Sequence, residues 1–292
     1  MSTTIPLSSS TSRAVKWGGV MVVTMGSLAL ASTAWADRAP DPMPGQVEAP
    51  QTSIGLTHWK LTLPVTKDGT VAGPGNAVEM IALEGLSVPP YFTVTADSIS
   101  FRAPTDGATT KGSHYPRSEL REMDGEGDEY DWVVEQGGIL TATLQVDELP
   151  KTTKGQPGAI VIGQIHGPDD ELCRLYFDNG ALYFVDDKAG KAAKETKFVL
   201  KSSAGKAAKI PLGERFSYTI DANSERLKVS VQYDDVTYTA TDPISAFWPG
   251  KELYFKAGVY VQVGKPGSGA GRMGTGWGGV TFYDISQPTH AN

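Results

Sequence analysis

The chain has 292 residues, with 26 lysines and arginines against 33 aspartates and glutamates, and a net charge of −7. This length suits one large domain or two small ones. The acidic balance argues against nonspecific nucleic-acid binding, and the single cysteine excludes an internal disulfide. Stability must therefore come from an ordinary hydrophobic core, which a chain of this size can supply.

Residues 1–36 have the pattern of a secretory signal peptide. Arg13 and Lys16 give a positive start, an apolar run follows over 18–30, and Ala36 ends a small-x-small cleavage pattern. A single transmembrane anchor is the alternative interpretation. We expect cleavage near Ala36, no stable membrane association and a secreted protein. The signal does not distinguish the periplasm from the extracellular medium. Its removal takes away two basic side chains and changes the net charge from −7 to −9.

Downstream, a proline-rich leader over 37–50 precedes a single predicted catalytic domain over 51–292. That domain is a series of short alternating runs broken by Gly, Asp, Asn and Pro. No segment shows a long 3.6-residue apolar period, so we expect strands and no helices. The expected strands cover 58–63, 91–94, 98–102, 139–146, 160–166, 172–177, 181–185, 216–220, 227–232, 236–239, 253–262 and 280–285.

Turn signals fit between these strands. Asp178-Asn179-Gly180 predicts a tight hairpin, and residues 221–224 predict another. About a dozen strands without helices favour an all-β fold, an antiparallel two-sheet β-sandwich or jelly roll. Cys173 alternates with apolar neighbours and is predicted to be a buried small hydrophobe. The segment 188–209 carries seven lysines. It predicts a solvated loop around a short strand at 198–200, with a role in gripping a polyanion as the alternative.

The first strand that carries chemistry lies over 115–123. Alternation places Arg117, Glu119 and Arg121 on one face, with the glutamate between the two arginines. Glu119 would orient both guanidinium groups and leave their outer forks for carboxylates. The strand rise puts the arginines about 13 Å apart, so each would bind a different acidic unit. A surface charge ladder is the alternative.

The second such strand lies over 160–166. Gln164 and His166 share a face, and we expect Val161, Gly163 and Ile165 to point into the core. His166 is a functional candidate because an amide lies two residues away and glycines clear the space on both sides. The other histidines, His58, His114 and His290, are interpreted as structural, and none has metal-ligand spacing.

The third strand lies over 254–262. Phe255, Ala257, Val259 and Val261 form an apolar face, while the opposite face combines Tyr254, Lys256, Gly258, Tyr260 and Gln262. Two tyrosines, a lysine and a glutamine around a glycine make a surface on which a flat polar ligand can lie close to the backbone. A half-exposed strand with chance polar residues is the alternative.

Taken together, these segments resemble a known family. Arg-Ser-Glu-Leu-Arg (117–121), Gln-Ile-His (164–166) and Tyr-Phe-Lys-Ala-Gly-Val-Tyr-x-Gln (254–262) resemble the three signature regions of polysaccharide lyase family 7, the alginate lyases. Residues 59–64 and 280–283 also resemble that family, so the similarity covers essentially the whole domain. One departure is Val261, where the family usually has Asn. Alternation places this position on the apolar side, away from Tyr260.

This resemblance implies a secreted lyase that cuts an acidic polysaccharide by β-elimination in a groove on the concave sheet. Arg117 and Gln164 would neutralise the carboxylate, His166 would be a base or polarising partner, and Tyr260 would protonate the leaving oxygen. Tyr260 would also be the base where the proton lies on the side of the leaving group. A tyrosine of ordinary pKa near ~10 is a poor base, and cations beside it would favour the phenolate.

The remaining face residues are expected to bind neighbouring sugars: Glu119, Arg121, Lys256, Gln262 and Tyr254. We expect no metal and no cofactor, because the arginine and amide do the neutralising. The expected partner of this monomer is an anionic polysaccharide, alginate by resemblance. The alternatives are a lyase that acts on another polyuronate such as glucuronan, a glycoside hydrolase of the same fold, and a carbohydrate-binding module. The sequence leaves the mannuronate or guluronate preference and endo or exo action open.

Two weaker motifs are interpreted as loops. Residues 269–274 match a dinucleotide-binding fingerprint, but that motif requires a helix after it, and here a strand follows. We expect a flexible loop over 264–279, after the third strand, that covers the groove. The acidic stretch 126–131 resembles the paired carboxylates of jelly-roll glycoside hydrolases. Its glycines and acids favour a solvated loop instead.

Overall fold

The computed structural model describes residues 42–71, 75–168, 170–187 and 195–291. The predicted signal peptide, the first residues of the leader and positions 188–194 of the lysine-rich segment lie outside these ranges. Pro42–Asn292 forms one compact unit. Every regular element within the described ranges is a strand, and nothing there is a helix that could cross a membrane.

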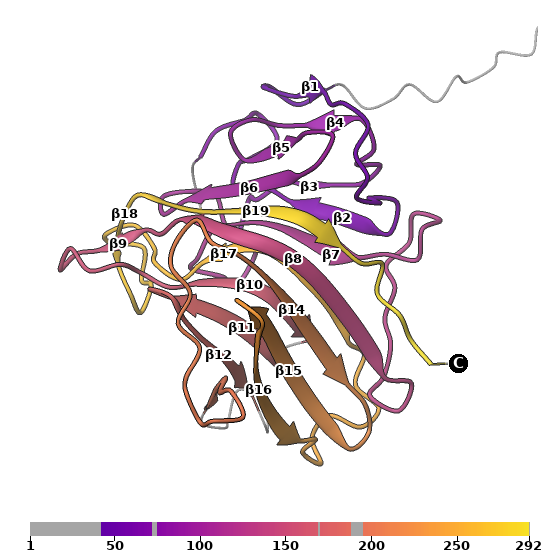
Figure 1. Cartoon of the computed structure of the whole chain (residues 1–292). Coiled ribbons are helices and arrows are strands. Elements are labelled where there is room, and N and C mark those ends of the chain that lie inside the picture. The colour runs from indigo at the N-terminus through magenta and orange to yellow at the C-terminus, as the bar shows by residue number, and fades with distance from the viewer. Residues whose placement is uncertain (1–41, 72–74, 169, 188–194, 292) are drawn as a thin grey trace, which may run out of the picture. The chain divides into compact units, whose positions relative to one another are not determined.

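Two antiparallel sheets make up this unit (Figure 1). The eight-stranded sheet has the order β13 (Thr196–Val199), β12 (Ala181–Asp186), β11 (Glu171–Asp178), β10 (Ile160–His166), β17 (Tyr254–Val261), β7 (Arg117–Glu122), β2 (Trp59–Thr62) and β3 (Glu79–Met80). The seven-stranded sheet has the order β16 (Val236–Pro243), β15 (Arg226–Tyr233), β14 (Arg215–Ala222), β8 (Gly138–Glu148), β19 (Trp277–Ile285), β6 (Ile99–Pro104) and β5 (Phe92–Val94). The predicted two-sheet all-β fold is confirmed.

Two short pairs complete the strands. β1 (Val47–Glu48) pairs with β4 (Leu86–Ser87), and β9 (Lys151–Thr152) pairs with β18 (Gly274–Thr275). These two-residue strands and β3 are absent from the sequence predictions, because two residues show no alternation. β1 lies inside the predicted leader, so part of that leader pairs with the domain.

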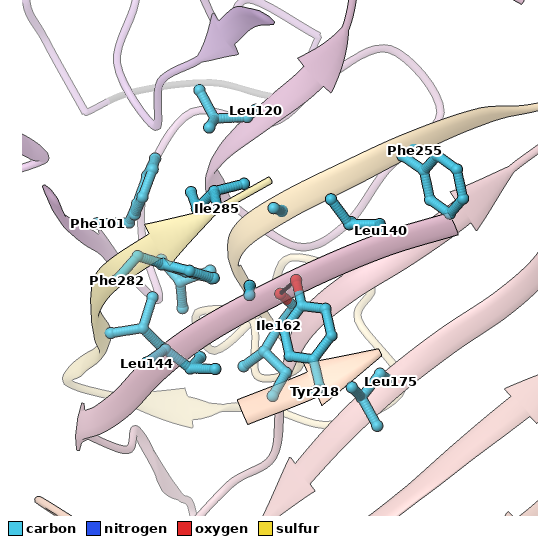
Figure 2. Packing of buried hydrophobic residues seen from close by; sticks show 14 of the residues in the cluster. Phe101, Leu120, Leu140, Leu144, Ile162, Leu175, Tyr218, Phe255, Phe282 and Ile285 are labelled. Carbon is cyan, nitrogen blue, oxygen red and sulfur yellow. Dashed lines mark hydrogen bonds between the residues drawn. The ribbon is translucent and has the colours of Figure 1, made fainter. Parts of the chain in front are cut away.

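The hydrophobic core lies between the two sheets. Leu120, Ile162 and Phe255 come from the eight-stranded sheet and meet Phe101 and Phe282 of the other, all without solvent exposure (Figure 2). Each buried side chain of this size contributes roughly 2 kcal/mol. The apolar face predicted for 254–262, Val261 included, belongs to this core. Its polar face is therefore turned away from the seven-stranded sheet.

Cys173 is fully buried in the same core, as predicted, and burial raises the pKa of its thiol. The predicted hairpin at 178–180 is also confirmed. Asp178 pairs with Ala181, and Asn179 and Gly180 have φ values of 50° and 87°, as a two-residue type I′ turn requires.

The predicted turn at 221–224 begins too early. Asp221 and Ala222 still pair with Lys228 and Leu227, so the chain turns after residue 222. Asp and Ala carry no signal that would have kept them in the strand. The short strand predicted at 198–200 is found at Thr196–Val199.

The prediction of a loop up to residue 279 is wrong at its end. β19 begins at Trp277, and Gly278 packs where a Cβ would come within 2.9 Å of Ile160 and Val261 side chains. The glycines of this segment led to the loop prediction, but at Gly278 the missing side chain lets the two sheets approach closely.

The prediction that Val161 points into the core is also wrong. The register of β10 shifts against both neighbouring strands between Val161 and Gly163. A β-bulge of this kind interrupts alternation. Ile162 belongs to the core and its carbonyl oxygen accepts a hydrogen bond from the Tyr218 hydroxyl, while a Cβ added to Gly163 would lie 2.8 Å from the same hydroxyl. Val161 consequently lies on the opposite face, in a separate apolar cluster with Tyr260.

Candidate active site

Three neighbouring strands bring the predicted site residues together. β17 lies between β10 and β7, and its Lys256 pairs with Gln164 on one side and Arg121 on the other. Further along the same strand, Tyr260 pairs with Arg117. Residues from distant parts of the sequence therefore share one sheet face.

Glu119 is the centre of this face. Its fully buried carboxylate accepts hydrogen bonds from Lys256 Nζ at 2.6 Å and from Arg117 at 3.2 Å, and a third from the Gln164 amide. Burial raises the pKa of Glu119, but the charges of Lys256 and Arg117 outweigh this and hold the pKa below its usual range. Glu119 is therefore an ionised anchor for three side chains.

The prediction that Glu119 also orients Arg121 is wrong. The Arg121 guanidinium donates to Asp131 at 2.6 Å, lies 3.2 Å from Glu129, and covers the Tyr254 ring at 4.1 Å. Asp131 and Glu129 belong to the acidic stretch that we predicted to be a solvated loop. This stretch is a loop, but its end ties down Arg121, which alternation along a strand cannot reveal.

Arg117 and Tyr260 are in direct contact. The guanidinium carbon lies 3.7 Å from the centroid of the Tyr260 ring. Burial lowers the pKa of Arg117, whereas Tyr260 and Glu119 raise it, and the net shift is upward. The Tyr260 hydroxyl lies 3.1 Å from the Ser113 hydroxyl. No sequence pattern indicated Ser113, which lies in a loop before β7.

His166 and Tyr254 form the other end of the cluster. Their rings stack 5.2 Å apart, and the Tyr254 hydroxyl lies 3.1 Å from His166 Nδ1. Burial, together with Lys256 and Arg117, lowers the pKa of His166 to about 3, so the imidazole is neutral near pH 7. Burial raises the pKa of Tyr254 to about 12.

A cavity of about 410 Å³ lies over these residues. Five lysines and arginines line it, opposed by three glutamates: Lys60, Lys111, Arg117, Arg121 and Lys256, with Glu79, Glu129 and Glu171. Tyr254, Tyr260 and His166 supply its rings. This cavity, called the groove below, is therefore locally cationic although the chain is acidic overall. A locally cationic groove suits an anionic ligand.

Gln262 lies elsewhere, in a second cavity of about 420 Å³. Tyr176 and Tyr183 stack there at 5.0 Å, and Lys197 lies 3.4 Å above the Tyr183 ring. Arg272, from the loop predicted over 264–279, lines this cavity as well. Val161 and Tyr260 share a cluster with both tyrosines, so the two cavities are neighbours on one face.

The remaining sequence features are His290 and the glycine-rich stretch 269–274. His290 contacts Glu122 at 2.6 Å and the Gly137 carbonyl at 3.0 Å. β18 begins at the last residue of the glycine-rich stretch 269–274 and β19 follows, so a strand comes after the stretch, as expected, and no helix follows within the described residues. No group of potential metal ligands is found in the part of the chain that the structure describes.

The fold and the groove define a β-jelly roll with a cationic cavity on its eight-stranded sheet, which suits an acidic ligand. A sequence model of the alginate lyase family matches residues 54–288. The chain belongs to this family and is a polysaccharide lyase.

Similar proteins agree with this assignment. An alginate lyase of Klebsiella pneumoniae is 33% identical over 274 residues, which cover 77% of this chain and 89% of the relative. The crystal structure of an alginate lyase from the same organism superposes with a TM-score of 0.67 and 28% identity, covering 81% of this chain and 96% of that one. A family 7 alginate lyase, A1-II′, solved with a substrate written GGMG, gives a TM-score of 0.64 and 26% identity, covering 84% and 98%.

Proposed function

We propose that this chain depolymerises alginate by β-elimination in the groove on the eight-stranded sheet. The observation that carries the proposal is the cluster of Arg117, Gln164, His166 and Tyr260 on one face, held by buried Glu119 and Lys256. Family membership gives alginate as the polymer.

The chemistry sets three requirements. Elimination removes the C5 proton of a uronate and expels the substituent on O4, leaving a C4–C5 double bond. The C5 proton is weakly acidic because the neighbouring carboxylate is already negative. The site must neutralise that carboxylate, take the C5 proton and protonate the leaving oxygen.

Arg117 supplies the neutralising charge, and Gln164 supports it. The Gln164 amide is fully buried and donates to Glu119, so it fixes the anchor beneath the groove. Because the Arg117 charge neutralises the carboxylate in the groove, the proposed elimination requires neither a metal nor a cofactor.

His166 and Tyr260 handle the protons. A neutral imidazole has a lone pair for the C5 proton, and the low pKa of His166 keeps the ring neutral at working pH. The Tyr260 hydroxyl gives its proton to O4. Where the C5 proton lies on the same side as O4, Tyr260 performs both steps.

The remaining residues fit neighbouring sugars. Lys256, Arg121 and Tyr254 line the first cavity, and Gln262 lines the second. A polymer lying across both cavities would contact all of them, whereas Glu119 acts from beneath the face.

The direct test is the ultraviolet absorbance of alginate incubated with purified protein and excess chelator. Elimination produces a conjugated double bond, so absorbance should rise in step with new reducing ends. New reducing ends without absorbance would indicate a hydrolase, and binding without either would indicate a carbohydrate-binding module. A rise with glucuronan alone would reassign the polymer.

We also propose that the chain is exported as a monomer after cleavage near Ala36. Support comes from the charged start, apolar run and small-x-small site of residues 1–36. Amino-terminal sequencing of the protein recovered from the periplasm and the medium should begin at Asp37. An intact first 36 residues on membrane-bound protein would support an anchor instead.

A further inference from the structure

A carboxylate beside the catalytic histidine is unexpected in a groove for an anionic polymer. Glu171 Oε1 lies 3.6 Å from His166 Nε2, and Glu171 lines the same cavity. The negative charge of Glu171 repels an anionic substrate and so weakens binding. A carboxylate at this position therefore indicates another role for Glu171. The sequence predictions did not include Glu171, although the register of β10 and β11 pairs it with His166.

The contacts of His166 assign its tautomer. Nδ1 contacts the Gly167 carbonyl oxygen, which only accepts, so this nitrogen carries the hydrogen. The stacked Tyr254 ring fixes the plane of the imidazole. Nε2 therefore holds the lone pair, and Nε2 is the nitrogen that Glu171 approaches. A separation of 3.6 Å is too long for a hydrogen bond but short enough for a strong charge interaction.

Glu171 is itself held in place. Arg174 Nε lies 3.8 Å from the Glu171 carboxylate, and the Glu171 backbone N–H donates to Asp187 at 3.5 Å. Arg174 in turn contacts Asp187 at 3.3 Å and Glu195 at 2.6 Å. The carboxylate is thus fixed by the neighbouring strand pair.

Two cations near His166 oppose protonation of its ring. Burial, Lys256 on β17 and Arg117 on β7 lower the pKa of His166, whereas Glu119, which contacts both cations, raises it. Glu171 is the carboxylate within contact of Nε2 among the described residues.

We propose that Glu171 is a positioning residue for His166, stabilising the positive charge that Nε2 gains with the C5 proton. This inference rests on the proposed function. In the step, the C5–H electron pair becomes the C4–C5 double bond, and the C4–O4 bond breaks with its pair on oxygen. O4 takes the Tyr260 proton, and the proton on Nε2 returns to the Tyr260 oxygen through water.

The proposal predicts a particular pH dependence. Burial raises the pKa of Glu171 to about 7, with Asp187 adding to the rise and Arg174 acting against it. The carboxylate is charged above that pH and neutral below it. We expect kcat to fall as the pH drops through about 7, on substrates for which His166 is the base.

Glu171→Gln should lower kcat by about 10- to 100-fold at pH 8 and leave KM within about threefold. The fall in kcat as the pH drops through about 7 should disappear in this variant. Glu171→Asp should have a higher kcat than Glu171→Gln and should show that fall again. Glu148→Gln is the matched control, because Glu148 also pairs with an arginine, Arg102, but on the other sheet. That variant should behave as wild type.

Nitrogen-15 shifts of His166 test the same claim without turnover. Wild type should show a protonated Nδ1 and a bare Nε2 at pH 8, and Glu171→Gln should keep this tautomer because the Gly167 carbonyl fixes it, so that the lower kcat of the variant reflects the missing charge. Equal kcat and pH profiles in wild type and a folded Glu171→Gln would overturn the proposal, as would a protonated Nε2 in wild type. A wild type without lyase activity would refute the proposed function, while the tautomer would still be measurable.

Discussion

At the scale of single residues, the site depends on opposite charges held close together out of water. Glu119 is fully buried, and only its three donors make an ionised carboxylate tolerable there. The same burial depresses the basicity of Lys256 and His166. The surroundings of Glu119, His166 and Lys256 therefore decide their charge.

Lys256 gives a prediction at this scale. Burial and the nearby Arg117 charge lower the pKa of Lys256 to about 8. Its ammonium is present below that pH and is lost above it. We expect KM for alginate to rise by about fivefold, or about 1 kcal/mol, between pH 7 and 9. Initial rates from ultraviolet absorbance measure this.

Lys256→Arg is the matched variant, because arginine keeps its charge throughout this range. Its KM should stay flat from pH 7 to 9, whatever its absolute value. A wild-type KM that does not change over the same range would show that the Lys256 charge does not contribute to substrate binding.

At the scale of elements, strand alternation placed most of the site correctly. A regular strand turns alternate side chains to opposite faces, so Arg117, Lys256 and Tyr260 could be assigned to one face from the sequence. Alternation failed at Val161, because a bulge is set by the pairing partner and not by the local pattern. Alternation also could not predict the roles of Asp131 and Ser113, because both lie in loops that bring them to the site.

The close approach of β17 and β7 can be tested at Gly258, which pairs with Glu119. Its φ is 145°, and an added Cβ would lie 2.6 Å from the Ser118 carbonyl oxygen and 2.7 Å from the Glu119 Cα. Gly258→Ala should therefore lower the free energy of unfolding by about 2 kcal/mol and move β7 away from Tyr260, with loss of activity. Urea unfolding measures the first effect.

Gly55→Ala is the control, since a Cβ there meets nothing within 4 Å. It should change the free energy of unfolding by less than about 0.5 kcal/mol. If Gly258→Ala matched this control in stability and activity, the close approach of β17 and β7 would have no energetic importance.

At the scale of the whole molecule, an acidic protein handles an acidic polymer by separating its charges. The net charge is −7, but the groove on the eight-stranded sheet is lined by more cations than carboxylates. Composition predicted an ordinary hydrophobic core without disulfides, and the many short alternating strands without helices predicted the two-sheet sandwich. The order of strands could not be predicted, because it depends on pairings such as β7 with β17, far apart in the sequence.

The central claim is that Tyr260 completes a β-elimination in this groove. The most direct measurement compares the ultraviolet absorbance of alginate with wild type and with Tyr260→Phe, whose fold is checked by circular dichroism. The account predicts a steady rise for wild type and a kcat at least about 100-fold lower for the variant, with alginate binding retained. Substantial turnover by a folded Tyr260→Phe protein would contradict it.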